Sequence, residues 1–304
     1  MAHTRFPADR GLASRMVATM FLLGLLYVVF IAVLIAVGSS AVVALLLAGG
    51  LLAVQYFASD RIALAAIGGK EVSPQQQPAL HAVVDRLCAL ADMPKPRVAI
   101  ADADIPNAFA TGRSPDKSVV CVTTGLLRRL DEPELEAVLA HELSHVAHRD
   151  VAVMTVASVL GLAAGLVVRF AFYGGLFGGF GRRGGREGGV PVVLVVILVS
   201  AVVYGISFLL TRALSRYREL SADRGAAAVT GRPSTLAAAL VKVSGEMSRI
   251  PTRDLRSAEP LNAFFFAPAL SRGFSLSSLF STHPPLERRL EQLARIEAES
   301  GPAA

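Results

Sequence analysis

The stretch AVLAHELSHVAHRD, residues 137–150, places three histidines and a glutamate among apolar side chains. His141 and His145 are four residues apart, so on a helix their rings project from one face about one turn apart. Two neutral imidazoles in that arrangement can bind one zinc ion, while Glu142 can reach a water on the metal without being a ligand. This H-E-x-x-H pattern predicts a zinc site with a general base beside it.

A catalytic zinc site needs a third protein ligand and one open position. His148 lies three residues beyond His145 and is rotated off the line of the first pair, so we do not choose it. Glu219, in SRYRELSADRG, is the best candidate, and Asp223 follows one turn later on the same side of its helix. A carboxylate at that position could accept the free N–H of a ligand histidine. An equally weighted alternative is that both acids pair only with neighbouring arginines.

The sequence DEPELEAVLAHELSHVAH, residues 131–148, predicts the helix that carries the histidine pair. Asp131 stands at the N-cap position, Glu134 at the capping-box position, and Pro133 is tolerated in the first turn. The apolar face is predicted from residues spaced by three and four: Leu135, Val138, Leu139, Glu142 and Val146. Because an apolar block follows directly, we expect this helix to run straight towards a membrane span.

Further elements surround this helix. Short strands rich in β-branched residues are predicted at 96–102 and 117–124, and residues 105–112 between them form either an edge strand or a turn. Helical spacing or flanking turn residues predict further helices at 78–90, 211–231, 234–249 and after Pro285. A mostly helical domain with a small sheet is therefore expected, which is an α+β fold.

The composition points to a membrane: 53% of the residues are hydrophobic and 18% are charged, which is more apolar than a soluble domain. The uncharged residues gather in four blocks at 16–37, 41–58, 151–168 and 190–210. The first block would be roughly 33 Å long as a helix, enough to cross a bilayer core. About four transmembrane helices are therefore predicted, the alternative for each block being a buried core helix.

The charges beside these blocks predict the topology. Arg5, Arg10 and Arg15 precede the first block, whereas the link GSS to the second is uncharged, so we expect the N-terminus in the cytoplasm. Residues 1–58 then form two transmembrane helices and 151–210 a membrane hairpin. The basic turn GGFGRRGGREGG in this hairpin opposes the rule, so either the hairpin does not cross fully or the other segments outweigh the turn.

The remaining segments, 59–150 and 211–304, then share the cytoplasmic side and could form one domain. The net charge of +6 comes without a basic stripe of interleaved aromatic residues, so no nucleic-acid partner is expected. Cys88 and Cys121 form no Cys-x-x-Cys unit, and we interpret both as reduced, packed residues.

Several motifs together resemble one family. HELSHVAHRD is followed by two apolar blocks, then by SRYRELSADRGAA and then by SLSSLFSTHPPLERRLEQL. In order and spacing these resemble the HtpX-type membrane zinc metallopeptidases, relatives of the CAAX prenyl proteases, along nearly the whole chain. The resemblance implies a gluzincin-like protease domain facing the cytoplasm, in a multi-pass protein of the bacterial cytoplasmic (inner) membrane, with one zinc ion per chain.

The resemblance also implies roles for single residues. It implies that the zinc ligands are His141, His145 and Glu219, with Glu142 as the general base. It implies that PNAFATG lies on the strand that holds the substrate backbone, at Asn107, Ala108 and Phe109. It further implies that His283, in STHPP, faces the active site and stabilises the transition state.

The expected function is hydrolysis of peptide bonds in misfolded or damaged membrane proteins, the role that the resemblance implies. The lipid bilayer is the other expected partner, and the sequence does not predict an oligomeric state. The main alternative is a non-catalytic membrane scaffold or chaperone-like protein with a structural zinc. Structural zinc sites often use cysteine ligands, and neither cysteine lies near the motif. A peptidase for prenylated C-terminal tails ranks lower, because four spans are too few for its large membrane chamber.

Overall fold

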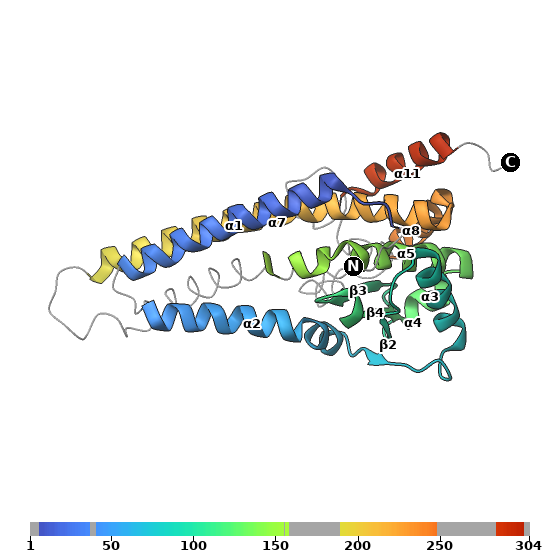
Figure 1. The fold of residues 1–304 in the computed structure, drawn as a ribbon, viewed down its shortest axis with the longest axis horizontal. Coiled ribbons are helices and arrows are strands. Elements are labelled where there is room, and N and C mark those ends of the chain that lie inside the picture. Colours follow the sequence, from blue (N-terminus) through green and yellow to red (C-terminus); the bar gives the residue numbers. More distant parts are fainter. Residues whose placement is uncertain (1–5, 37–40, 155, 158–188, 248–283, 301–304) are drawn as a thin grey trace. The chain divides into compact units, whose positions relative to one another are not determined.

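The computed structural model describes residues 6–36, 41–154, 156–157, 189–247 and 284–300 (Figure 1). The chain divides into two compact units. Unit 1 comprises Met1–Leu12, Ala58–Ala152 and Ser215–Ala304, and unit 2 comprises Ala13–Phe57 and Val153–Leu214.

Long apolar stretches lie in α1 (Arg10–Ala36), α2 (Ala41–Ala66) and α7 (Gly189–Thr230). Within the described residues, two segments are long and apolar enough to cross a membrane, Arg10–Val33 and Leu194–Thr230. They contain most of the first and all but the start of the fourth predicted span. The second predicted span lies in α2, and most of the third lies outside the described residues. The structure thus shows two of the four predicted spans.

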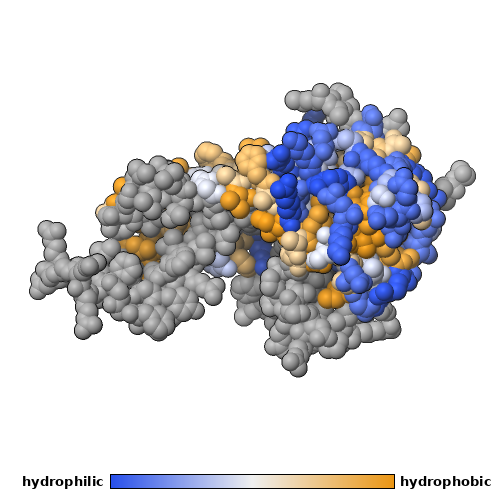
Figure 2. Space-filling model, turned by 90° about the horizontal axis from the view of Figure 1, so that it is seen from below, coloured by the Kyte–Doolittle hydropathy of each residue, from blue (hydrophilic) through white to orange (hydrophobic). Residues whose placement is uncertain are grey.

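The side chains of α1 and α7 support a lipid environment. Val17 and Phe21 of α1 are each 70% exposed, and Leu209 of α7 is 64% exposed. Removing apolar surface from water is worth roughly 25 cal/mol per Å², so these side chains suit lipid better than water. Leu23 and Val203 are buried where α1 and α7 lie side by side (Figure 1). Hydrophilic residues, blue in Figure 2, cover much of the visible surface of unit 1.

Unit 1 contains a four-stranded mixed sheet of order β1-β2-β4-β3. Its strands are β1 (Lys70–Glu71), β2 (Arg97–Ala101), β3 (Ala108–Gly112) and β4 (Ser118–Thr123). β2 and β4 are parallel, whereas β1 and β3 pair antiparallel with their neighbours. The strand predictions are confirmed, and the segment left open between edge strand and turn contains the edge strand β3.

The two faces of this sheet pack against different helices. Val120 and Val122 join the main core with α3 (Pro78–Ala91) and α5 (Glu132–His148). On the other face, Phe109 and Cys121 pack against Leu64 near the end of α2. Burial raises the pKa of the Cys121 thiol to about 12 and that of the Cys88 thiol to about 11. Both cysteines are free and buried, as predicted.

Helix α5 begins as the sequence predicts. The Asp131 side chain accepts from the Glu134 N–H at 2.9 Å, and the Glu134 side chain accepts from the Asp131 N–H at 3.1 Å. The residues of the predicted face, Leu135, Val138, Leu139, Glu142 and Val146, are buried or packed against the core, and burial extends around the helix, because α5 is buried continuously from Ala137 to Val146. A helix surrounded by protein on all sides fixes its side chains firmly, which suits a helix that carries ligands.

The prediction that the helix α5 continues straight into the next apolar block is wrong. Arg149 has a left-handed backbone with φ 55°, and its N–H donates to the Val146 carbonyl at 3.1 Å. Helical backbone resumes at Asp150. The left-handed residue ends α5 and changes the direction in which the following side chains project.

Helix α7 is continuous over 42 residues, where the sequence predicted a span and a separate helix. Its contact with α5 is close at Gly225, because a Cβ there would collide with the Ser144 side chain. The remaining described helices are α4 (Thr124–Arg129), α8 (Pro233–Met247) and α11 (Leu286–Ser300). Both α8 and α11 match predicted helices, and they pack together in the core through Leu240 and Leu293.

The residues before α1 dock onto the α7 part of unit 1. Phe6 is buried in the main core, and Asp9 accepts hydrogen bonds from Ser221 at 2.7 Å and from Arg224. Asp9 also caps α1 by accepting from the Leu12 N–H at 2.8 Å. Burial raises the pKa of Asp9, but these bonds outweigh it and lower the pKa to about 2. Asp9 therefore stays ionised at neutral pH.

Candidate metal centre

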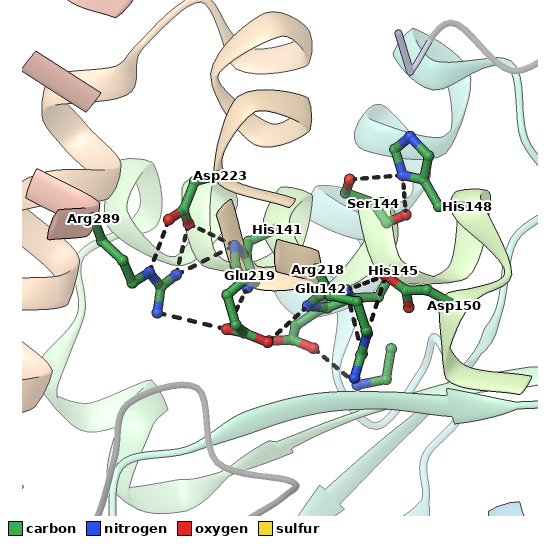
Figure 3. A network of polar contacts seen from close by, with 11 residues as sticks. His141, Glu142, Ser144, His145, His148, Asp150, Arg218, Glu219, Asp223 and Arg289 are labelled. Carbon is green, nitrogen blue, oxygen red and sulfur yellow. Dashed lines mark hydrogen bonds and ion pairs between the residues drawn. The ribbon is translucent and has the colours of Figure 1, made fainter. Parts of the chain in front are cut away.

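Three buried side chains converge between α5 and α7 (Figure 3). His141 and His145 come from α5 and Glu219 from α7, and one donor atom of each lies within 4.8 Å of the others. His141 Nε2 lies 3.5 Å from Glu219 Oε2, and His145 Nε2 lies 3.5 Å from Glu219 Oε1. Among the described residues this is the one such group that could hold a metal ion. The three ligands predicted from the sequence are thus brought together.

The other nitrogen of each imidazole meets a carboxylate. His141 Nδ1 lies 2.9 Å from Asp223 Oδ1, and His145 Nδ1 lies 2.9 Å from Asp150 Oδ2. A carboxylate on Nδ1 holds the hydrogen there and leaves Nε2 as the electron-pair donor, the arrangement common for metal-binding histidines. Both Nε2 atoms point at Glu219, so the donor set fits a metal ion.

The electrostatics of the group also fit a cation. Burial lowers the pKa of His141, but its hydrogen bonds with Asp223 and Glu219 outweigh burial, and the pKa is raised. Burial likewise lowers the pKa of His145, and the charge of Asp150 outweighs it, so this pKa is raised too. Positive charge is therefore favoured between these side chains, and the two nitrogen donors with one carboxylate match the ligands that zinc takes.

Each of the two carboxylates is itself held by an arginine. Arg289 of α11 is 1% exposed and contacts Asp223 twice, Nε to Oδ2 at 2.8 Å and Nη2 to Oδ1 at 2.6 Å. Its Nη1 lies 3.7 Å from Glu219 Oε2. Arg218 Nε lies 3.2 Å from Asp150 Oδ2. Asp223 and Glu219 thus meet an arginine of α11, whereas Arg218 meets Asp150 and Arg224 meets Asp9.

Glu142 lies beside the ligands and is 5% exposed. Its Oε2 accepts a hydrogen bond from the Ala110 N–H of β3 at 3.0 Å. Burial raises the pKa of Glu142, which the neighbouring histidines oppose only in part. A carboxylate whose pKa is moved towards neutrality suits the work of a general base.

The predicted substrate residues begin the edge strand β3. The Asn107 N–H donates to Thr123 Oγ1 at 2.9 Å, and the Asn107 carbonyl accepts from the Thr123 N–H at 2.9 Å. Pairing alternates along an antiparallel strand, so Asn107 and Phe109 turn their backbone groups to β4 while Ala108 and Ala110 turn theirs outwards. The outward groups lie on the side where the Ala110 N–H meets Glu142.

Two further histidines were considered from the sequence. His148 contacts the Ser144 carbonyl at 2.8 Å and the Pro7 carbonyl at 3.1 Å, so it lies apart from the ligand group. His283 lies outside the described residues. Sequence reasoning missed Asp150 and Arg289, the first because of its place after a helix end and the second because its partner is distant in the chain.

Comparison with known proteins agrees with this geometry. The model of the family described as Peptidase family M48 matches residues 74–297. This range contains the proposed ligand group, Glu142, the sheet strands β2 to β4 and most of α11. The chain therefore belongs to peptidase family M48 and is a metalloprotease of that family.

The relatives narrow the class. Protease HtpX homolog 1 of Streptomyces coelicolor is 60% identical over 300 residues, which cover 99% of this chain and 97% of the relative. Protease HtpX homolog of Moorella thermoacetica is 55% identical, covering 96% of each chain. Within family M48 the chain is thus of the HtpX type, as the sequence motifs predicted. The crystal structure of S. mikatae Ste24p matches with a TM-score of 0.52 at 16% identity, covering 94% of this chain and 67% of that one. This last likeness concerns the fold alone.

Proposed function

We propose that this chain is a zinc-dependent endopeptidase of the bacterial cytoplasmic membrane that cleaves misfolded or damaged membrane proteins. The observation that carries the proposal is the buried convergence of His141, His145 and Glu219 with Glu142 beside them. The exposed apolar helices α1 and α7 support the membrane location, and the basic residues Arg5, Arg10 and Arg15 before the first uncharged block support a protease domain on the cytoplasmic side.

His141, His145 and Glu219 would hold one zinc ion. When bound, zinc supplies Lewis acidity that polarises the scissile carbonyl and lowers the pKa of a bound water towards about 7. Asp223 keeps the hydrogen of His141 on Nδ1, so that Nε2 faces the ion. The role of Asp223 is thus orientation of a ligand.

Glu142 is the proposed general base. It takes the proton of the attacking water and then passes it to the leaving amine. Burial raises the pKa of its carboxyl group, and the Ala110 N–H holds its Oε2 in place. The same contact places the base next to the open edge of β3.

The substrate is proposed to add to β3 as an extended strand. The outward N–H and C=O groups of Ala108 and the outward C=O of Ala110 offer backbone hydrogen bonds, which give affinity with little sequence preference, while the Ala110 N–H donates to Glu142. Asn107 and Phe109 support this strand through their pairing with β4. Low sequence preference suits an enzyme that degrades many different damaged proteins.

His283 is proposed to stabilise the transition state. It comes three residues before α11, which begins at Leu286. Arg289 of α11 lies 3.7 Å from the proposed ligand Glu219, so α11 is tied to the centre. The place of His283 in the sequence, just before this helix, supports the role that the resemblance implied.

Replacing Glu142 by Gln tests the proposal. Purified protein in detergent is expected to cleave casein when loaded with zinc, and Glu142→Gln is expected to keep zinc and lose activity by about 10²–10⁴-fold. Glu134→Gln, at the far end of the same helix, is the matched control and is expected to cleave normally. A zinc-loaded Glu142→Gln protein that cleaves at the wild-type rate would overturn the mechanism.

The scaffold alternative makes a different prediction. A structural zinc would be needed for the fold, and wild-type protein would bind it without cleaving any peptide. Chelation that unfolds the protein, together with no proteolysis by the zinc-loaded form, would favour that alternative. Glu219→Ala is expected to weaken zinc binding, and unchanged zinc affinity would remove Glu219 from the ligand set.

A further inference from the structure

We infer that Asp150 and Arg218 form a positioning pair that fixes the orientation and the protonated nitrogen of the His145 ring for metal binding. The left-handed backbone of Arg149 makes this pair possible. The inference rests on the proposed metal-dependent function and deepens it. It assigns a purpose to two buried charged residues that the proposed reaction does not otherwise use.

The hydrogen-bond roles follow from the partners. Asp150 is 1% exposed, and its Oδ2 lies 2.9 Å from His145 Nδ1 and 3.2 Å from Arg218 Nε. An arginine is always charged and has donors only. Its Nη2, 3.4 Å from His145 Nδ1, therefore cannot accept the imidazole proton. The carboxylate alone accepts it, so Nδ1 carries the hydrogen and Nε2 keeps its electron pair for a metal ion.

The backbone explains how Asp150 reaches His145. On a continuous helix a residue five positions further on is rotated by about 140° around the axis, so its side chain would project away from His145. Arg149, with φ 55° and ψ 20°, breaks the helix between them. Non-glycine residues rarely adopt this left-handed conformation. Here it turns the carboxylate of Asp150 back onto the end of α5, beside the second ligand (Figure 3).

Arg218 gives the pair its second function. It directly precedes Glu219 on α7, so its contact with Asp150 ties the end of α5 to the residue next to the third ligand. Arg289 and Asp223 make the corresponding tie at His141. Each of the two proposed ligand histidines thus contacts an aspartate, and each aspartate contacts an arginine. Both groups also connect α5 with α7, one at His141 and the other at the end of α5.

Metal affinity distinguishes positioning from a merely structural ion pair. The parent protein carries Glu142→Gln, so that it binds zinc without cleaving itself. Asp150→Ala in this parent is expected to weaken zinc binding 10–100-fold in competition with a chromophoric chelator. Asp150→Asn keeps a hydrogen-bond acceptor without the charge, so its zinc affinity is expected to lie between that of the parent and that of Asp150→Ala. The Co²⁺-loaded variants are expected to show altered visible absorption, because the ligand geometry changes.

Controls separate the possible failures. Glu134→Gln weakens an ion pair with Lys242 at the other end of α5 and is expected to leave zinc affinity unchanged. If Asp150→Ala does not fold, Asp150→Asn with Arg218→Gln removes both buried charges together, and at least tenfold weaker zinc binding is expected. A folded variant with parental affinity and a parental Co²⁺ spectrum overturns the inference. A parent that binds no zinc overturns the proposed function itself.

Discussion

The two proposed ligand histidines are held by the same chemistry, but the chain supplies it in different ways. His141 is held by Asp223 of α7, and Asp223 is held by Arg289, which is 148 residues from His141. His145 is held by Asp150, which is only five residues away, with Arg218 behind it. One support forms when distant helices pack, whereas the other forms when a helix ends.

The difference teaches where each ligand is vulnerable. The support of His141 depends on α11 reaching its place, because Arg289 is part of that helix. The support of His145 depends on the backbone conformation of one residue, Arg149. Long-range packing can be lost by changes far from the centre, while the support of His145 depends on the end of α5 and on Arg218 of α7.

The largest effect is expected from Arg289→Ala, which breaks the long-range support. It leaves the buried carboxylates of Asp223 and Glu219 without their arginine, and removing one partner of a buried ion pair costs about 3–5 kcal/mol. Thermal unfolding is expected at a clearly lower temperature, and zinc binding is expected to weaken as well. Arg289→Lys keeps the charge but loses the bidentate contact with Asp223, so its unfolding temperature and zinc affinity should lie between those of the wild type and of Arg289→Ala. Wild-type stability in Arg289→Ala would show that α11 does not hold His141.

A double-mutant cycle sharpens the comparison. Asp150→Ala and Asp223→Ala are each expected to weaken zinc binding 10–100-fold in the Glu142→Gln parent. Asp223→Ala should cost more, since it also frees Arg289 beside Glu219. Both supports act on one ion, so the double variant is expected to lose less than the sum, with a coupling of about 0.5–3 kcal/mol. Strict additivity of the two losses would mean that the supports work independently.

The smallest effect is expected from Arg149→Gly. Glycine adopts the left-handed conformation without strain, so stability should change by no more than about 1 kcal/mol and zinc affinity should stay the same. Arg149→Val is the matched counterpart, because a β-branched residue resists this conformation. It is expected to turn Asp150 away and weaken zinc binding as Asp150→Ala does. Equal zinc affinity in the valine and glycine variants would separate the helix end from the role of Asp150.

Much of the centre was predictable because it follows helical geometry. The spacing of His141 and His145 placed two proposed ligands on one face, and the spacing of Glu219 and Asp223 placed a third proposed ligand and its neighbour on a second helix. The capping box of α5 was predicted for the same reason, since Asp131 and Glu134 interact within one turn. Regular local geometry can be read from a sequence.

What escaped prediction depends on irregular or distant geometry. Asp150 was missed because an unbroken helix would turn its side chain away from His145. The residue types of Arg149 and Asp150 do not predict a left-handed backbone at Arg149. Arg289 was missed because helical spacing says nothing of which helix packs against α7. The pairing of Asn107 with β4 rather than with the open edge depends on strand register, which only the folded sheet fixes.

The position of Arg289 has a consequence for the order of synthesis. Chains emerge from the ribosome N-terminal part first, at about 5–20 residues per second. His141, Glu142 and His145 are therefore made well before Arg289, and during that interval Asp223 lacks the guanidinium that holds it. A nascent chain that ends before residue 289 thus contains His141, Glu142 and His145 but lacks the arginine that contacts Asp223. The support of His141 is therefore complete only after the chain has passed residue 289.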